Sequence, residues 1–223
     1  MSSNAEFPQP TLSTTGYGTI SVTPDVAVLR FYVYRTHPTD HMVAYREAVD
    51  AAQQVIAALK DEGVGDDSIR TVDIDTDTRY HTDRQGRRHL VEHAVRYVIE
   101  VRVRDFDLAG KLLGRALAVG ASEASLWGFE VSDVREVELQ AVAEAVRHAR
   151  QRAEAAARAA GVRVGQPLRM QLHLSGRGSR YGDRDSFVAY SAGPADEPSA
   201  PITPGQREIG AEVEVTFALK MSG

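Results

Sequence analysis

The chain has 223 residues, of which 43% are hydrophobic and 26% charged, and its formal net charge is −5. This length and composition predict a globular protein of one large or two small domains, and exclude global disorder and a membrane-spanning segment. The acidic balance argues against a nucleic-acid partner, and the absence of cysteine excludes disulfides, thiolate catalysis and zinc–thiolate sites.

The N-terminal residues, Met1–Glu6, lack the basic and apolar regions of a secretory signal. We therefore expect a cytoplasmic protein. Residues 1–13 are predicted to form a flexible tail, and residues 14–220 a domain whose two halves are 26–132 and 133–220.

Two glycines, Gly16 and Gly18, raise the question of a phosphate-binding loop. Such a loop needs a strand before the glycines and a helix after them. Here a proline-containing segment precedes the glycines and an alternating β-rich run, Thr19–Thr23, follows them. The pattern favours a β-hairpin that turns at Pro24 and continues into a second strand.

The segment from Val26 to Arg35 is nearly all apolar or aromatic, which is typical of a strand buried on both faces. A helix capped by Thr39 or Asp40 and ended by Gly63 follows, because apolar residues recur there at spacings of three and four. The residues expected on its buried face are Tyr45, Val49, Ala52, Ile56 and Leu59.

Two alternating strands joined by a charged tip come next, at about 72–79 and 97–104. In the second of them, Tyr97, Ile99, Val101 and Val103 are expected to face in and Glu100 to face out. A helix capped by Asp105 or Asp107 and a strand over 122–132 complete a β-α-β-β-α-β order. That order predicts a ferredoxin-like split βαβ core over residues 26–132.

A long alanine-rich helix is predicted over 133–160, followed by strands at 163–174 and 208–220. Between these strands, residues 175–206 are rich in glycine, serine, proline and aspartate and predict a long loop. The expected fold class is α+β, with a mostly antiparallel sheet in which the long helix and the two C-terminal strands extend the ferredoxin-like core.

Three carboxylates alternate along one predicted strand, at Asp73, Asp75 and Asp77. A calcium-binding EF-hand loop would need glycine and glutamate where Thr78 and Arg84 stand. We therefore interpret the three aspartates as a solvated strand face, neutralised across the hairpin by arginines at positions 96, 102 or 104.

Two further clusters are candidates for binding, and each has a plain alternative. His81, His89 and His93 form a weak metal site if the hairpin folds His81 back beside the others; otherwise they are exposed histidines without a role. The second cluster lies in the long loop and consists of Arg177, Arg180, Tyr181 and Arg184. These residues bind an anion or an acidic partner; the alternative is that they belong to a solvated loop without a ligand. We assign no catalytic residue, no cofactor-binding residue and no firm metal ligand.

The order of the predicted elements and several sequence segments resemble the SIMPL-domain family, which includes periplasmic immunogenic and oxidative-stress-defence proteins of bacteria. The resemblance covers about residues 14–220. It is carried by Gly16-x-Gly18 before "ISVTPDVAVL", by "VIAALKDEGVGDDSIRTVDI", by "VRVRDFDLAGKLLGRALAVGA", by "GFEVSD" and by "RAEAAARAAGVRVGQPLRM". The resemblance implies an α+β fold, large homo-oligomers, and a loose link to stress defence or the cell envelope. The family has no established catalytic mechanism, so the resemblance implies no active-site residues.

Two hypotheses of function follow. The first is a non-enzymatic, self-assembling scaffold or binding module. The alternative is a small-molecule or metal-binding protein with hydrolytic activity. For self-assembly, the sequence offers a terminal strand, Glu208–Lys220, with an edge free to pair. It also offers an arginine-rich flank (Arg147, Arg150, Arg152 and Arg158) facing acidic residues of a neighbour (Glu136, Glu138 or Glu144), a contact that salt would weaken.

Overall fold

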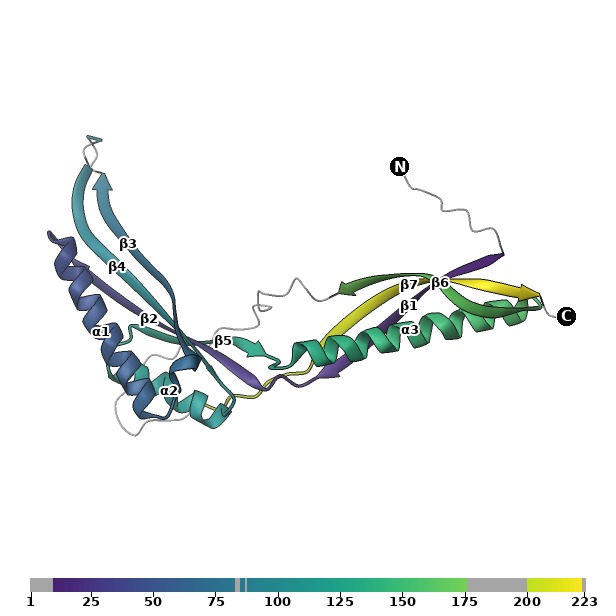
Figure 1. Ribbon diagram of the computed structural model, residues 1–223. Helices are drawn as coiled ribbons and strands as arrows, with labels where there is room; N and C mark the ends of the chain where they lie inside the picture. Colours follow the sequence, from purple (N-terminus) through teal and green to yellow (C-terminus); the bar gives the residue numbers. More distant parts are fainter. Residues whose placement is uncertain (1–9, 83–84, 87, 176–199, 222–223) are drawn as a thin grey trace. The chain divides into compact units, whose positions relative to one another are not determined.

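The computed structural model describes residues 10–82, 85–86, 88–175 and 200–221 (Figure 1). These residues form two compact units. The ferredoxin-like unit contains residues 24–130 and 200–204. The helix–sheet unit combines residues from both ends of the described chain, 10–23 and 205–221, with residues 131–175.

The ferredoxin-like unit has a four-stranded antiparallel sheet with the strand order β3-β4-β2-β5. Along the chain its elements are β2 (Val26–His37), α1 (His41–Asp61), a short 3₁₀ turn (Asp66–Ser68), β3 (Ile69–Thr82), β4 (Arg88–Val103), α2 (Phe106–Ala118) and β5 (Glu123–Glu130). This order and pairing confirm the ferredoxin-like core that the sequence predicted.

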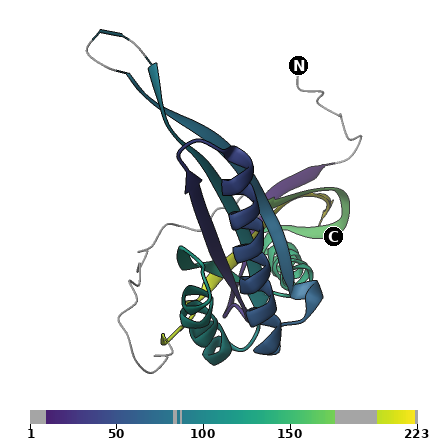
Figure 2. The ribbon, with the colours of Figure 1, turned by 90° about the vertical axis from the view of Figure 1, so that its left-hand side faces the viewer.

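Both helices of this unit contribute to one apolar core on the same face of the sheet, and Figure 2 shows α1 running along that face. Phe31 from β2 and Ile99 from β4 are fully buried against Val55 and Leu59 from α1 and Leu112 from α2. β2 is buried over most of its length, as expected for a central strand.

The buried face of α1 agrees in part with the predicted one, because Ala52 and Leu59 are buried as expected. Ala44 and Ala48 are fully buried, whereas Tyr45 is 37% exposed. Small alanines let the helix backbone lie close to the sheet, so the bulkier neighbour is turned outward. The helix begins after Asp40, whose carboxylate accepts hydrogen bonds from the backbone N–H groups of Met42 and Val43.

The helix–sheet unit has a three-stranded antiparallel sheet of order β1-β7-β6, packed against the long helix α3. Its elements are β1 (Thr11–Val22), α3 (Val134–Ala159), β6 (Val162–Ser175) and β7 (Arg207–Met221). β7 is the central strand, so the prediction that it has an edge free to pair is wrong. The two edges of this sheet are β1 and β6.

The predicted hairpin between the first two strands is also wrong, although both strands exist. β1 pairs with β7 along its whole length, and β2 pairs with β4 and β5. Pro24 and Asp25 therefore lead from one sheet to another and do not form a hairpin turn. Packing against α3 accompanies the difference, because Leu12 and Ile20 of β1 pack against the apolar cluster that β7 forms with the helix.

Five alanines spaced four residues apart form the buried stripe of α3: Ala141, Ala145, Ala149, Ala153 and Ala157. Leu139, which precedes the stripe in the helix, is 58% exposed. The stripe lies against Gly16 and Gly18 of β1, where no β carbon fits. The two glycines that raised the question of a phosphate loop thus permit a close approach of helix to strand.

Side chains of α3 also bind the outer backbone edge of β1. Nδ1 of His148 lies 3.1 Å from both the backbone nitrogen and the backbone oxygen of Tyr17, and its tautomer decides which of them it bonds. Arg152 donates to the carbonyl oxygen of Thr15 at 2.8 Å. The edge of β1 is thereby occupied within the chain.

Candidate functional site

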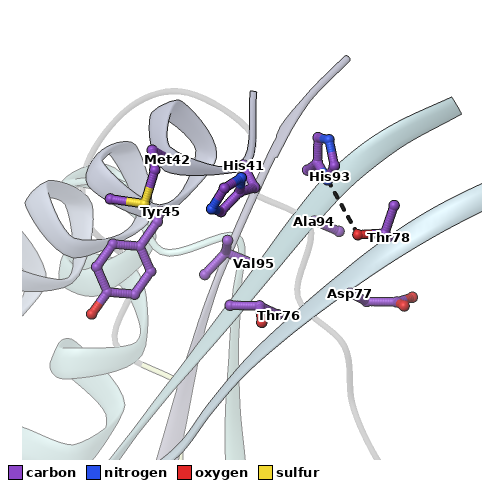
Figure 3. Close-up of a pocket in the computed structure, with 9 residues that line it drawn as sticks. All are labelled: His41, Met42, Tyr45, Thr76, Asp77, Thr78, His93, Ala94 and Val95. Carbon is purple, nitrogen blue, oxygen red and sulfur yellow. Dashed lines mark hydrogen bonds between the residues drawn. The ribbon is translucent and has the colours of Figure 1, made fainter. Parts of the chain in front are cut away.

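A cavity of about 280 Å³ lies in the ferredoxin-like unit, between the first turn of α1 and the strands β3 and β4 (Figure 3). It is lined by side chains of mixed character: His41, Met42, Tyr45, Thr76, Asp77, Thr78, His93, Ala94 and Val95. Figure 1 shows β3 and β4 continuing past the start of α1 toward the hairpin tip, so the cavity lies at the end of the helix-covered part of the sheet.

The end of β2 and the start of α1 bring the histidines of this region together. His37 is the last residue of β2, and its Nδ1 accepts a hydrogen bond from the backbone N–H of Asp40 at 2.9 Å. Asp40 in turn caps α1, which makes His41 the first residue of the helix. His37 also stands opposite His93 in the pairing of β2 with β4.

His41 and His93 are in direct contact across the mouth of the cavity. Their ring centroids are 5.8 Å apart in an edge-to-face arrangement. Nδ1 of His93 is hydrogen-bonded to the hydroxyl of Thr78 at 3.2 Å, which fixes the orientation of that ring (Figure 3). The site thus offers two imidazoles, a hydroxyl and an adjacent thioether around a small cavity.

A second cluster surrounds Glu100 on the sheet face opposite the helices. Glu100 faces away from the helix-covered core, as predicted, but it is buried there and only 1% exposed. One carboxylate oxygen binds Arg30 at 2.9 and 3.0 Å, and the other binds Arg70 at 2.6 Å and Arg102 at 3.0 Å. The arginines cover the carboxylate and compensate its charge, which offsets the free-energy cost of removing the carboxylate from water.

Aromatic side chains continue this cluster across the sheet. The guanidinium carbon of Arg30 lies 3.5 Å from the ring centroid of Trp127, a cation–π contact. Tyr32 and Tyr34 stack with centroids 6.1 Å apart. Burial, reinforced by the charge of Glu123, raises the pKa of Tyr34 above the usual value. Because both oxygens of Glu100 are engaged by arginines, we interpret this cluster as an ion-pair network that joins β2, β3 and β4.

The histidines proposed from the sequence do not all come together. The backbones of His81 and His89 stand opposite each other in the β3–β4 hairpin, whereas His93 pairs with Thr78, farther along the strands. Within the described ranges, no group of three histidine, aspartate or glutamate side chains is placed to hold a metal ion. His93 instead contacts His41, which belongs to no motif in the sequence.

The other predicted sites have different outcomes. Arg96 binds Asp73 at 2.6 Å and lies 3.9 Å from Asp75. The prediction that an arginine across the hairpin neutralises the aspartates is thus confirmed for Asp73 and Asp75, with Arg96 as the partner. The four residues suggested as a ligand or partner loop lie outside the described residues: Arg177, Arg180, Tyr181 and Arg184. None of the described helices combines the length and the apolar character that a membrane crossing requires.

The chain is similar to three curated bacterial proteins over nearly its whole length. It is 26% identical to a "26 kDa periplasmic immunogenic protein" of Brucella abortus (strain S19), over 94% of this chain and 84% of the relative. A protein of the same name from Brucella melitensis gives the same values. The "Uncharacterized protein YggE" of Edwardsiella ictaluri is 26% identical over 96% of this chain and 90% of the relative.

These similarities overturn the cytoplasmic location that we expected from the N-terminal residues. Two of the relatives are periplasmic proteins by name, and they match this chain over 94% of its length. The same resemblance is seen at the level of the family, because the model of a protein family of unknown function (DUF541) matches residues 12–217. The chain therefore belongs to the SIMPL family.

Proposed function

We propose that this protein is a non-enzymatic, self-assembling scaffold or binding module of the periplasm, linked to the cell envelope or to stress defence. The names of the Brucella relatives support the compartment. The observation that carries self-assembly is the β6 edge of the helix–sheet unit, which pairs with no further strand among the described residues and where apolar side chains remain half exposed.

Met170 and Leu172 of β6 stand opposite Val215 and Val213 of β7 in the sheet. The two valines are 1% exposed beneath α3, whereas Met170 is 51% and Leu172 is 50% exposed. Directly opposite residues of paired strands point to the same face, so the apolar face of the sheet continues beyond the part that α3 covers. An exposed apolar edge strand is a site for pairing with another chain.

The contact between arginines of α3 and glutamates of a neighbouring copy, which the sequence suggested, has less support than the apolar edge at β6. Arg147 forms an ion pair with Glu144, and Arg150 pairs with Glu154 at 2.9 Å, both within α3. Arg152 is bound to the backbone of β1. Three of the four arginines are thus engaged within the chain. We therefore expect assembly to depend on apolar burial at β6 and to resist salt.

Light scattering of the parent and of two variants tests this proposal. The parent should show a mass above that of the monomer at both low and high salt. Changing Met170→Lys together with Leu172→Lys places charges on the apolar face and should reduce the mass to that of the monomer.

Gln171→Lys is the control, because it adds one positive charge to the same strand but on the opposite face, where Gln171 is already exposed. This control should assemble like the parent. A parent that is monomeric at every salt and protein concentration, or a control that dissociates as fully as the double variant, would contradict the proposal.

Ligand binding is the second candidate function, and the cavity beside His41 and His93 is the observation that favours it. A thermal-shift screen of the purified protein against metal ions and small metabolites tests it. Binding at this cavity should raise the melting temperature of the parent and leave that of the His93→Ala variant unchanged. Equal shifts in both proteins would place the ligand elsewhere.

A further inference from the structure

We propose that the β6 edge of one copy of the chain pairs with the β3 edge of a second copy, so that two sheets join strand to strand. This inference rests on the self-assembly proposed above and names the surface that β6 meets. Because the contact joins two different surfaces, each copy uses β6 toward one neighbour and β3 toward another.

The choice of β3 follows from a comparison of the sheet edges. The edge of β1 is bound by His148 and Arg152 of α3, and β5 is short, with 8 residues. β3 and β6 each have 14 residues, and in the part of the chain that the structure describes each pairs with a strand on one side only. A long unpaired edge offers a row of backbone N–H and C=O groups to another chain.

The two edges carry apolar side chains on corresponding faces. Ile74 of β3 stands opposite Tyr97 of β4, and Tyr97 packs against the core beneath the helices. Ile74 therefore points to the helix-covered side of its sheet, as Met170 and Leu172 do in theirs. It is 46% exposed, about as much as these two residues of β6. Joining the edges with both helix-covered sides on one face brings the three apolar side chains together.

The cavity beside α1 gives this contact room. Thr76 of β3 stands opposite Val95, which packs against α1, so Thr76 lies on the same face as Ile74. It lines the cavity together with Met42 and Tyr45 of the helix (Figure 3). A residue opposite Thr76 on an added strand points to this face, where an apolar side chain removes exposed surface of Met42 and Tyr45 from water.

The polar faces of the two edges differ in charge. Asp73, Asp75 and Asp77 alternate on the other face of β3, and Arg96 binds the first two. Asp77 forms no ion pair with another described residue, and neither does Arg169, which is exposed on the polar face of β6. Two β3 edges would bring like charges together, whereas β6 brings an arginine to the aspartates. The charges thus favour β6 as the partner of β3.

One antiparallel register satisfies both faces, with Asp77 opposite Arg169. The same register pairs the residues of the apolar faces: Thr76 with Met170, and Ile74 with Leu172. Residues 73–77 and 169–173 each lie in a regular part of their strand, between or beyond its register shifts. A slip by one residue would set the apolar face of one strand beside the polar face of the other, so the register is specified.

Light scattering of mixed variants tests the contact. Ile74→Lys with Thr76→Lys blocks the β3 edge, as Met170→Lys with Leu172→Lys blocks the β6 edge. Each double variant alone should be monomeric at protein concentrations where the parent assembles. Their equimolar mixture should form a heterodimer, because one intact β3 edge and one intact β6 edge remain.

Gln53→Lys with Gln54→Lys is the matched control, because it adds the same charge at exposed positions of α1. It should assemble like the parent, and circular dichroism verifies the folding of each variant. A β3 variant that assembles like the parent, or a mixture that stays monomeric, would overturn the inference and leave self-assembly through β6 in place. A monomeric parent would instead remove the self-assembly on which the inference rests.

Cross-linking tests the register, because the chain has no cysteine of its own. With oxidised glutathione as the oxidant, Thr76→Cys mixed with Met170→Cys should form a disulfide-linked heterodimer, since directly opposite residues of antiparallel strands lie within disulfide reach. Thr76→Cys mixed with Gln171→Cys should not, because Gln171 points to the other face. Equal cross-linking in both mixtures, or none in either, would overturn the proposal.

Discussion

A β carbon at Gly16 would lie 2.0 Å from the carbonyl oxygen of Ala145, so helix α3 and strand β1 touch through their backbones at this point. At Gly18 the corresponding distance is 2.1 Å, to the carbonyl oxygen of Ala141. The obstructing atoms belong to the helix backbone and cannot move aside as a flexible side chain would.

We therefore expect Gly16→Ala to lower the free energy of unfolding by about 3 kcal/mol or more, since added atoms in a packed contact force the backbone apart. Chemical denaturation measured by circular dichroism is the readout. Gly114→Ala is the control, because nothing lies within 4 Å of the added carbon and the position is inside α2. That control should be neutral or stabilising by up to about 1 kcal/mol. Equal stability of Gly16→Ala and the parent would contradict the close contact.

Strand positions were predictable from the sequence, but the partner of one strand was not. The alternation in residues 19–23 and the apolar run after Val26 correctly indicated strands, because each pattern is local. The pairing of the first of these strands, β1, depends on β7, at the other end of the chain. The short turn-like segment at Pro24 favoured pairing of β1 with β2, the next strand in the sequence. The alanine stripe of α3, which packs against Gly16 and Gly18, accounts for the pairing of β1 with β7 instead.

The carboxylate of Glu100 provides a second test, of the ion-pair network that joins β2, β3 and β4. Glu100→Gln keeps the shape of the side chain but removes the charge that faces Arg30, Arg70 and Arg102. Breaking a buried ion pair by removing one partner typically costs about 3–5 kcal/mol, so we expect a loss of stability in that range.

Glu92→Gln is the matched control, because Glu92 pairs with Arg79 at 2.8 Å in a far more exposed position. That change should cost less than about 1 kcal/mol. Denaturation of both variants under the same conditions gives the comparison. If the two losses are equal, the network around Glu100 does not stabilise the sheet as inferred.

The contact between His41 and His93 was hidden in the sequence for a related reason. His93 was noticed because it belongs to a cluster of histidines at the hairpin tip. His41 lies at the start of a helix, and neither periodicity nor spacing connects it with β4. The connection arises because Asp40 ends the loop after β2 and starts α1 beside that strand. The burial of Glu100 was missed for the same reason, since Arg30 and Arg70 reach it from two other strands.

The cap of α1 should make the stability of the protein depend on pH in acid. Hydrogen bonds from the backbone N–H groups of Met42 and Val43 stabilise the charged carboxylate, the bond from Met42 contributing most, and they lower the pKa of Asp40. The stabilisation is therefore present above the ordinary aspartate pKa of about 3.9 and is lost as the pH falls through the lower value of the folded protein.

Asp40→Asn keeps an acceptor oxygen but cannot titrate, so its melting temperature should fall less than that of the parent between about pH 5 and about pH 2. Asp50→Asn, an exposed change within α1, is the control and should follow the parent. Superimposable pH profiles of all three proteins would show that the cap does not contribute to acid sensitivity.

Trp127 is the single tryptophan of the chain, and Arg30 covers its ring. Arg30→Met removes the guanidinium from the ring and from the carboxylate of Glu100 while keeping an unbranched side chain. We expect a stability loss of about 1.5–3 kcal/mol from the lost charged hydrogen bonds, together with an altered emission maximum and stronger quenching of Trp127 fluorescence by acrylamide. Arg104→Met changes an exposed arginine that follows β4 and should leave both readouts unchanged. If the emission and quenching of Trp127 in the Arg30→Met variant match those of the parent, the guanidinium does not shield the ring, and the cation–π contact contributes nothing measurable to this sheet face.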